Sequence, residues 1–164
     1  MIRFDKFRVL VFLTCGYALF IFFLSSLSSP PSPHDIGFLR EFMGELMGLF
    51  EDNRLKFLLS PLYIAYLHPD KFAHVVLYMV LGLLLNRTLS CADNAFLKRY
   101  PALFAIFIGT LYGVTDEFHQ MFVPYRTSSS IDLFADFLGL LFVQLLIVFY
   151  SGIIRLLSKE YERH

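Results

Sequence analysis

The sequence contains no tryptophan, only two cysteines, and no net charge at neutral pH with neutral histidines. Two cysteines cannot form the dense disulfide framework of a small secreted protein, so we expect Cys15 and Cys91 to be free thiols. The balanced charge gives no sign of the basic surface that nucleic-acid binding requires. These absences exclude a disulfide scaffold and leave nucleic acid out of the expected partners.

Several motifs that identify enzymes and pumps are also missing. No HExxH sequence and no paired-cysteine spacing occurs, although either would indicate a zinc site. A divalent metal, Mg²⁺ or Zn²⁺, therefore has only weak support from the sequence, and the cofactor is left open. No glycine-rich nucleotide-binding motif occurs, so we do not expect the chain itself to couple nucleotide hydrolysis to transport.

Apolar residues are what the sequence has in abundance. They make up 57% of its 164 residues, with 20 phenylalanines, whereas a soluble domain averages about 45–50%. The length allows one compact bundle and no second domain. We therefore predict an all-α, polytopic membrane protein that forms a single domain over residues 1–164.

Four apolar stretches are long enough to cross a bilayer as helices, which takes about 20 residues each. They cover approximately residues 7–27, 71–89, 100–121 and 130–157. The prediction is a bundle of four transmembrane helices. Gly109 and Gly113 form a small-xxx-small pair in the third stretch, which allows close approach of a neighbouring helix or of a second copy in a homo-oligomer.

The first stretch has two interpretations. Basic residues precede an apolar run there, as they do in a secretory signal peptide. The apolar core, residues 9–24, is longer than the usual ~7–15 residues of a signal peptide, and no A-x-A-like cleavage site follows it. We therefore favour a retained membrane helix.

A proline-rich linker, residues 28–33, separates the first stretch from an amphipathic segment. Apolar residues recur at three- and four-residue spacing over residues 35–59. The pattern fits an amphipathic helix lying in the membrane interface, and equally a helix packed on the end of the bundle. The role of residues 35–66 is left open.

Basic residues are concentrated in three segments: before the first stretch, between the second and third, and after the fourth. The positive-inside rule assigns such segments to the cytoplasm, so we expect both termini there, together with the polar loop around residues 90–99. The hairpin between the third and fourth stretches has Arg126 as its only basic residue. This hairpin is therefore expected on the extracytoplasmic side.

Ionisable side chains gather at the ends of three of these predicted helices. Each costs roughly 2.5–3.5 kcal/mol at the centre of a membrane helix, which makes such residues candidates for function. We assign His74, Asp116 and Asp132 as catalytic candidates, and Lys71, Tyr78, Gln120, Arg126 and Asp136 as binding candidates. His74 suits a general base or a metal ligand, while Lys71 and Arg126 suit an anionic group. Glu117 is interpreted as a solvated helix end.

Three elements of the sequence resemble motifs of VanZ-like membrane proteins. Residues 70–82 resemble D-K-x-x-H-x-x-x-Y-x-x-L-G, residues 113–120 resemble G-x-x-D-E-x-x-Q, and residues 124–139 resemble P-G-R followed by S-x-x-D-x-x-A-N with a glycine. The elements occur in the family's order, and the resemblance covers roughly residues 7–155. Tyr125 and Asp136 depart from it: the first removes a glycine that tolerates positive φ, and the second adds a carboxylate.

The resemblance implies a bacterial cytoplasmic-membrane protein and a link with resistance to the glycopeptide antibiotic teicoplanin. That drug binds cell-wall precursors outside the membrane, so an outward-facing site fits the drug's target. The expected partners are the lipid bilayer and a lipid-linked or cell-envelope precursor.

Three functions and one structural alternative fit these observations. The chain could be an enzyme that acts on the precursor headgroup, a non-catalytic protein that binds and shields it, or a small transporter subunit. Four helices leave little room for a transport pathway without oligomerisation. Alternatively, the polar residues form a rim of ion pairs that holds the helices together. Whether the chain is an enzyme stays open.

Overall fold

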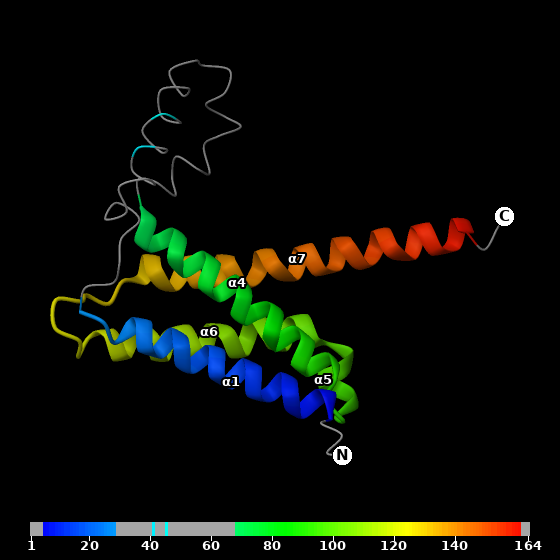
Figure 1. Cartoon of the computed structure of the whole chain (residues 1–164), viewed down its shortest axis with the longest axis horizontal. Coiled ribbons are helices and arrows are strands. Elements are labelled where there is room, and N and C mark those ends of the chain that lie inside the picture. The colour runs from blue at the N-terminus through cyan, green and yellow to red at the C-terminus, as the bar shows by residue number, and fades with distance from the viewer. Residues whose placement is uncertain (1–4, 29–40, 42–44, 46–67, 162–164) are drawn as a thin grey trace.

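The computed structural model describes residues 5–28, 41, 45 and 68–161. Within these residues the protein is all-α and contains no strand, as predicted. Its helices are α1 (Lys6–Ser25), α4 (Pro69–Ser90), α5 (Ala95–Arg99), α6 (Pro101–Gln120) and α7 (Ser130–Tyr161), which Figure 1 labels. The four long helices match the four predicted stretches to within a few residues at each end.

Three of the described helices are long and apolar enough to cross a membrane. They are α1, α4 from Asp70, and α7 as far as Ser158. The fourth candidate, α6, has 20 residues but carries Asp116 and Glu117 in its last turns, and these charges lower its mean hydropathy. The prediction of a helical membrane protein therefore holds, while the count of spans that length and composition establish is three.

The segment between α4 and α6 differs from the predicted polar loop, because it contains the short helix α5. The side-chain carbonyl of Asn94 accepts hydrogen bonds from the backbone N–H groups of Phe96 (2.9 Å) and Leu97 (3.3 Å). An asparagine in this position satisfies backbone donors that a helix start leaves free. Five residues are too few to show a hydrophobic period, which is why the sequence pattern missed this helix.

The predicted amphipathic helix after the proline-rich linker lies outside the described residues, apart from Glu41 and Glu45. Both of these residues are helical and exposed.

Helix α4 is central to the bundle, because it packs against α1, α6 and α7. Small residues allow the closest approaches. A Cβ atom at Gly139 would collide with the backbone carbonyl of Val75, so α7 crosses α4 with almost no side chain between them. Gly109 faces Leu140 in the same way, which shows that the predicted small-xxx-small pair packs α6 against α7. The buried centre of the bundle includes Ile21, Tyr78, Leu81, Ala105 and Leu140.

Polar side chains also join the helices within the bundle. The side chain of Asn86 donates to Gln144 (2.6 Å), whose own NH₂ donates to the carbonyl of Gly82 (3.1 Å). The hydroxyl of Thr14 on α1 is hydrogen-bonded to that of Thr88 on α4 (2.8 Å). The Asn86–Gln144–Gly82 contacts join α4 to α7, and the Thr14–Thr88 contact joins α1 to α4.

The outer surface of the described bundle is strongly apolar. Phenylalanine, leucine, isoleucine and valine side chains of α1, α6 and α7 are exposed along the whole length of these helices. Such a surface suits a lipid environment. Both cysteines are free thiols, as predicted.

The turn between α6 and α7 contains the one non-glycine residue with positive φ among the described residues. Tyr125 has φ of 63° and its side chain is 97% exposed. The sequence comparison with the VanZ-like motif places a glycine here, and the structure keeps the backbone conformation that favours glycine. The turn is closed by the N–H of Arg126 donating to the carbonyl of Val123 (3.1 Å).

Candidate functional site

The first turns of α4 and α7 meet the last turns of α6 at one end of the bundle, which we call the site end (Figure 1). The short α5 connection returns the chain, so that α6 ends where α4 begins. At the site end these three helices bring together one lysine, one histidine and four carboxylates, which we call the carboxylate cluster: Lys71, His74, Asp116, Glu117, Asp132 and Asp136.

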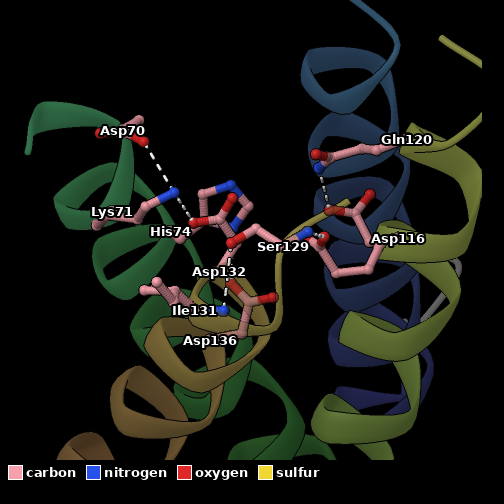
Figure 2. Close-up of polar contacts among 10 residues, drawn as sticks. Asp70, Lys71, His74, Asp116, Gln120, Ser129, Ile131, Asp132 and Asp136 are labelled. Atoms are coloured by element: carbon pink, nitrogen blue, oxygen red, sulfur yellow. Dashed lines mark hydrogen bonds and ion pairs between the residues drawn. The ribbon is translucent and has the colours of Figure 1, made fainter. Parts of the chain in front are cut away.

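A histidine–aspartate pair lies at the centre of the cluster. His74 Nδ1 and Asp136 Oδ1 are 2.8 Å apart, and Asp136 is completely buried (Figure 2). An ionised carboxylate can only accept hydrogen bonds, so Asp136 fixes the proton of the imidazole on Nδ1. The second ring nitrogen, Nε2, is then the acceptor or ligand atom.

Lys71 lies beside this pair, between two aspartates. Its ammonium group forms ion pairs with Asp132 and with Asp70 (2.9 Å). Asp132 is buried, whereas the side chain of Asp70 is 56% exposed. The positive charge of Lys71 is thus already shared by two carboxylates of the protein itself.

Helix α6 supplies the other two carboxylates. Asp116 accepts a hydrogen bond from the side-chain amide of Gln120 (3.3 Å), one turn further along the helix. Glu117 accepts one from the backbone N–H of Ser129 (2.7 Å) at the start of α7. The hydroxyl of Ser129 in turn accepts from the N–H of Ile131 (3.2 Å), so this serine caps α7.

Several buried oxygens of the cluster have no hydrogen-bond partner among the described residues. They are Asp116 Oδ1, Glu117 Oε1 and Asp136 Oδ2, and the buried hydroxyl of Tyr78, outside the cluster, has no partner in the described part of the chain either. A buried polar atom without a partner costs roughly 1–3 kcal/mol, and more when it is charged. In a native protein such an atom has a specific explanation, which can be strain, a catalytic role, or a bound water or ion. The cluster therefore presents free acceptor atoms inside the bundle.

The structure brings most of the predicted site residues to this place. Lys71, His74, Asp132 and Asp136 are bonded in pairs, and Asp116 with Gln120 faces them from α6 (Figure 2). The ring of Tyr78 lies next to Gly113, whose missing Cβ would be 3.4 Å from it, in the layer below the cluster. These residues come from three helices, as the sequence analysis expected.

Arg126 is placed differently from the other binding candidates. Its guanidinium donates to the backbone carbonyls of Leu27 (3.1 Å) and Leu24 (3.5 Å) at the end of α1. A cation suits that position, because the last carbonyls of a helix carry partial negative charge. Its hydrogen bonds among the described residues therefore fasten the α6–α7 turn to α1.

Glu117 is the residue of the cluster that the sequence analysis missed. It was interpreted as a solvated helix end, yet only 5% of its surface is exposed. Residues 116 and 117 are about 100° apart around a helix, so they can both be buried only where the helix is covered on two sides. The contacts of α6 with α4 and with α7 provide that cover. The adjacent acids Asp116 and Glu117 are the feature of the sequence that could have indicated this burial.

The fold and the cluster define a class of protein: an all-helical membrane protein with four buried carboxylates and a partly buried histidine at one end of its bundle. A family model described as VanZ/LLP1 matches residues 9–151. The match spans most of the chain, so this protein belongs to the VanZ/LLP1 family, in agreement with the resemblance seen in the motifs. Searches of curated proteins and of solved structures found no significant match.

Proposed function

We propose that the protein is a single-domain, four-span membrane protein whose carboxylate cluster binds, and acts on, the headgroup of a lipid-linked cell-envelope precursor. The observation that carries this proposal is the burial of four carboxylates beside His74 at one end of an otherwise apolar bundle, with several of their oxygens unpartnered among the described residues. Ionisable groups held at membrane depth are costly, and they mark sites more often than scaffolding.

The fourth span of this proposal is α6. Its 20 residues extend about 30 Å, which is the thickness of the hydrocarbon core. Its two acids, Asp116 and Glu117, are buried in the bundle, which is where charged residues of a transmembrane helix are found. With four spans, the starts of α1 and α6 and the ends of α4 and α7 share one side.

The site end is proposed to face the extracytoplasmic side of a bacterial cytoplasmic membrane, with both termini in the cytoplasm. The support comes from the basic residues, which flank the helix ends opposite the site end. A site at that face meets a lipid-linked precursor at the depth of its headgroup. It also fits the glycopeptide resistance that the VanZ-like motifs imply, because those drugs act on the same side.

The chemistry of the proposed site depends on His74. Asp136 orients its ring, and an imidazole held by a carboxylate serves as a general base or as a metal ligand. The neighbouring carboxylates and Gln120 would bind hydroxyl and amide groups of a headgroup. A non-catalytic binding protein is the second candidate, since Lys71 and Asp132 already pair with each other and offer no free reactive group.

The proposal is tested by identifying lipids that copurify with the protein by mass spectrometry. We expect a precursor lipid with a large polar headgroup in the wild type, and its loss in Asp116→Asn. Asp70→Asn is the matched control, because it removes an exposed carboxylate of the same end of the bundle and should keep the lipid. Ordinary phospholipids alone in the wild type, under conditions where the precursor is abundant, would contradict the proposal.

A His74→Gln variant separates the two candidate functions. If the protein is an enzyme, this variant should retain the precursor in unprocessed form, at a higher occupancy than the wild type. If the protein only binds the headgroup, the wild type and the variant should carry the same chemical form of the lipid. The ratio of processed to unprocessed lipid is the quantity to compare.

A further inference from the structure

The carboxylate cluster has an imbalance of charge. Four buried carboxylates face one lysine and one histidine, and Lys71 is occupied by Asp132 and Asp70. Among the described residues, the backbone N–H of Ser129 is the only donor to Glu117. An anionic headgroup would be repelled by such a site, because like charges at a few ångströms disfavour each other strongly away from water. Among the described residues, the carboxylates of the cluster therefore outnumber its cations.

Three of its residues are arranged as ligands of one ion. His74, Glu117 and Asp136 each offer one ligand atom, and these atoms all lie within 4.8 Å of one another. The residues come from α4, α6 and α7 respectively. A divalent ion with ligands at about 2.0–2.2 Å needs donor atoms about 3–4 Å apart, so side-chain adjustments of about 1 Å complete the geometry.

An independent observation also indicates a ligand at this place. Asp136 Oδ2 and Glu117 Oε1 have no hydrogen-bond partner among the described residues, and both side chains are more than nine-tenths buried. Gly113 of α6 lies against the free Asp136 oxygen, which a Cβ would approach to 3.1 Å. The glycine thus leaves this oxygen uncovered by any side chain at that position.

We propose that His74, Glu117 and Asp136 bind a divalent cation, which gives an anionic precursor headgroup its point of attachment. This inference rests on the proposed function, and it selects the ligand role of His74 over that of a general base. One nitrogen and two carboxylate oxygens suit Zn²⁺ or Mn²⁺, whereas Ca²⁺ takes more ligands and only oxygen. Three protein ligands leave open coordination positions for a phosphate oxygen or water.

The ion also accounts for the burial of the acids. Its two positive charges balance Glu117 and Asp136, which leaves Asp116 beside Gln120 as the remaining acid. A headgroup oxygen on an open position would then meet a positive centre rather than a ring of carboxylates. Lys71 keeps its structural pair with Asp132 throughout.

The test is a titration of the detergent-purified protein with Mn²⁺ after treatment with EDTA, followed by electron paramagnetic resonance of the free ion. We expect one Mn²⁺ per chain and a nitrogen coupling from His74 in the pulsed spectrum. Glu117→Gln and Asp136→Asn should each weaken binding about tenfold or more, while the control Asp70→Asn should bind as the wild type does. Absence of binding to the wild type, or binding by both ligand variants as tight as that of the wild type, would overturn the inference.

Both variants are expected to fold, because each substitution keeps an oxygen where the acid has one. Their folding is checked independently of metal binding. Glu117→Gln can still accept from Ser129, and Asp136→Asn from His74. Each should elute as the wild type does in size-exclusion chromatography. If a variant does not fold, the stoichiometry and the nitrogen coupling of the wild type still decide the question.

Failure of this inference can be told apart from failure of the proposed function by repeating the lipid identification in EDTA and in Mn²⁺. Equal retention of the precursor lipid in both conditions would contradict the cation site but would still support a headgroup site. Binding of Mn²⁺ without any copurified precursor lipid would support the cation site but contradict the proposed function. Retention of the lipid in Mn²⁺ and its loss in EDTA is the expected result.

Discussion

The substitution Asp136→Asn distinguishes a functional cluster from a structural rim by the sign of its effect on stability. The asparagine oxygen can still accept from His74 Nδ1, which lies 2.8 Å from the aspartate oxygen. The bond changes from charge-assisted to neutral, which costs about 1 kcal/mol. If the cluster is only a structural rim of ion pairs, the substitution should destabilise the protein by roughly 3–5 kcal/mol, because a buried ion pair would lose one partner.

The substitution Asp136→Asn also removes electrostatic repulsion within the cluster, which offsets this cost. The ligand oxygens of Asp136 and Glu117 are no more than 4.8 Å apart. Two like charges at that distance repel by roughly 3 kcal/mol at an effective dielectric constant of about 20. The net expectation for the ion-free protein is a gain of about 2 kcal/mol in the free energy of unfolding.

The assay is thermal unfolding of detergent-purified protein in EDTA. For a chain of this size, 1 kcal/mol corresponds to about 2–4 °C, so Asp136→Asn should unfold about 4–8 °C above the wild type. Adding Mn²⁺ should raise the unfolding temperature of the wild type and not that of the variant. An unfolding temperature of Asp136→Asn about 6 °C or more below that of the wild type in EDTA would contradict a functional cluster and support a structural rim of ion pairs.

Three further predictions concern the rest of the bundle. Tyr125→Gly should raise the free energy of unfolding by about 0.5–1 kcal/mol in denaturant titration, because the positive φ of 63° strains any side chain; a loss would mean that the ring makes a contact of its own. Gln144→Leu should lower the unfolding temperature by the equivalent of about 1–3 kcal/mol, since Asn86 loses its buried acceptor, and an unchanged value would contradict the importance of that pair. In a cysteine-free background, Ser128→Cys should react with an impermeant thiol reagent on intact cells and Asn94→Cys should not; the opposite labelling would invert the topology.

Much of the fold could be predicted from the sequence, because long apolar runs bounded by proline, serine and charged residues leave few alternatives to membrane helices. Helix α6, for example, was expected over residues 100–121 and runs from Pro101 to Gln120. Proline at its first position lacks the N–H that a helix start cannot use, which makes the boundary readable. The five-residue helix α5 was not predicted, because its cap at Asn94 is a local signal without any hydrophobic period.

The sequence indicated most of the residues that the structure brings together in the carboxylate cluster, Glu117 excepted, but it did not indicate how they pair. Helical phase puts Lys71, His74 and Tyr78 on one face of α4, where Lys71 and His74 are level with the acids of α7 and Tyr78 lies below them. Which acid bonds to which base depends on how the helices are rotated and offset, and Gly139 sets that offset through its contact with Val75. A contact between backbones leaves no pattern in the sequence beyond a glycine.

Arg126 illustrates the same limit at the turn. Its charge alone suits an anion, and only the position of α1 reveals that its hydrogen bonds go to the last carbonyls of that helix. Glu117 illustrates the opposite case, since its burial follows from two neighbouring helices that a single helical face does not disclose.

Photo-crosslinking in membranes shows directly whether a precursor headgroup occupies the carboxylate cluster. A photoreactive residue at Ile131, which is exposed beside Asp132 at the site end, should capture a lipid with the precursor headgroup. The same residue at Phe107, exposed midway along α6, should capture ordinary phospholipid only. Identical phospholipids at both positions, in membranes that contain the precursor, would contradict the account.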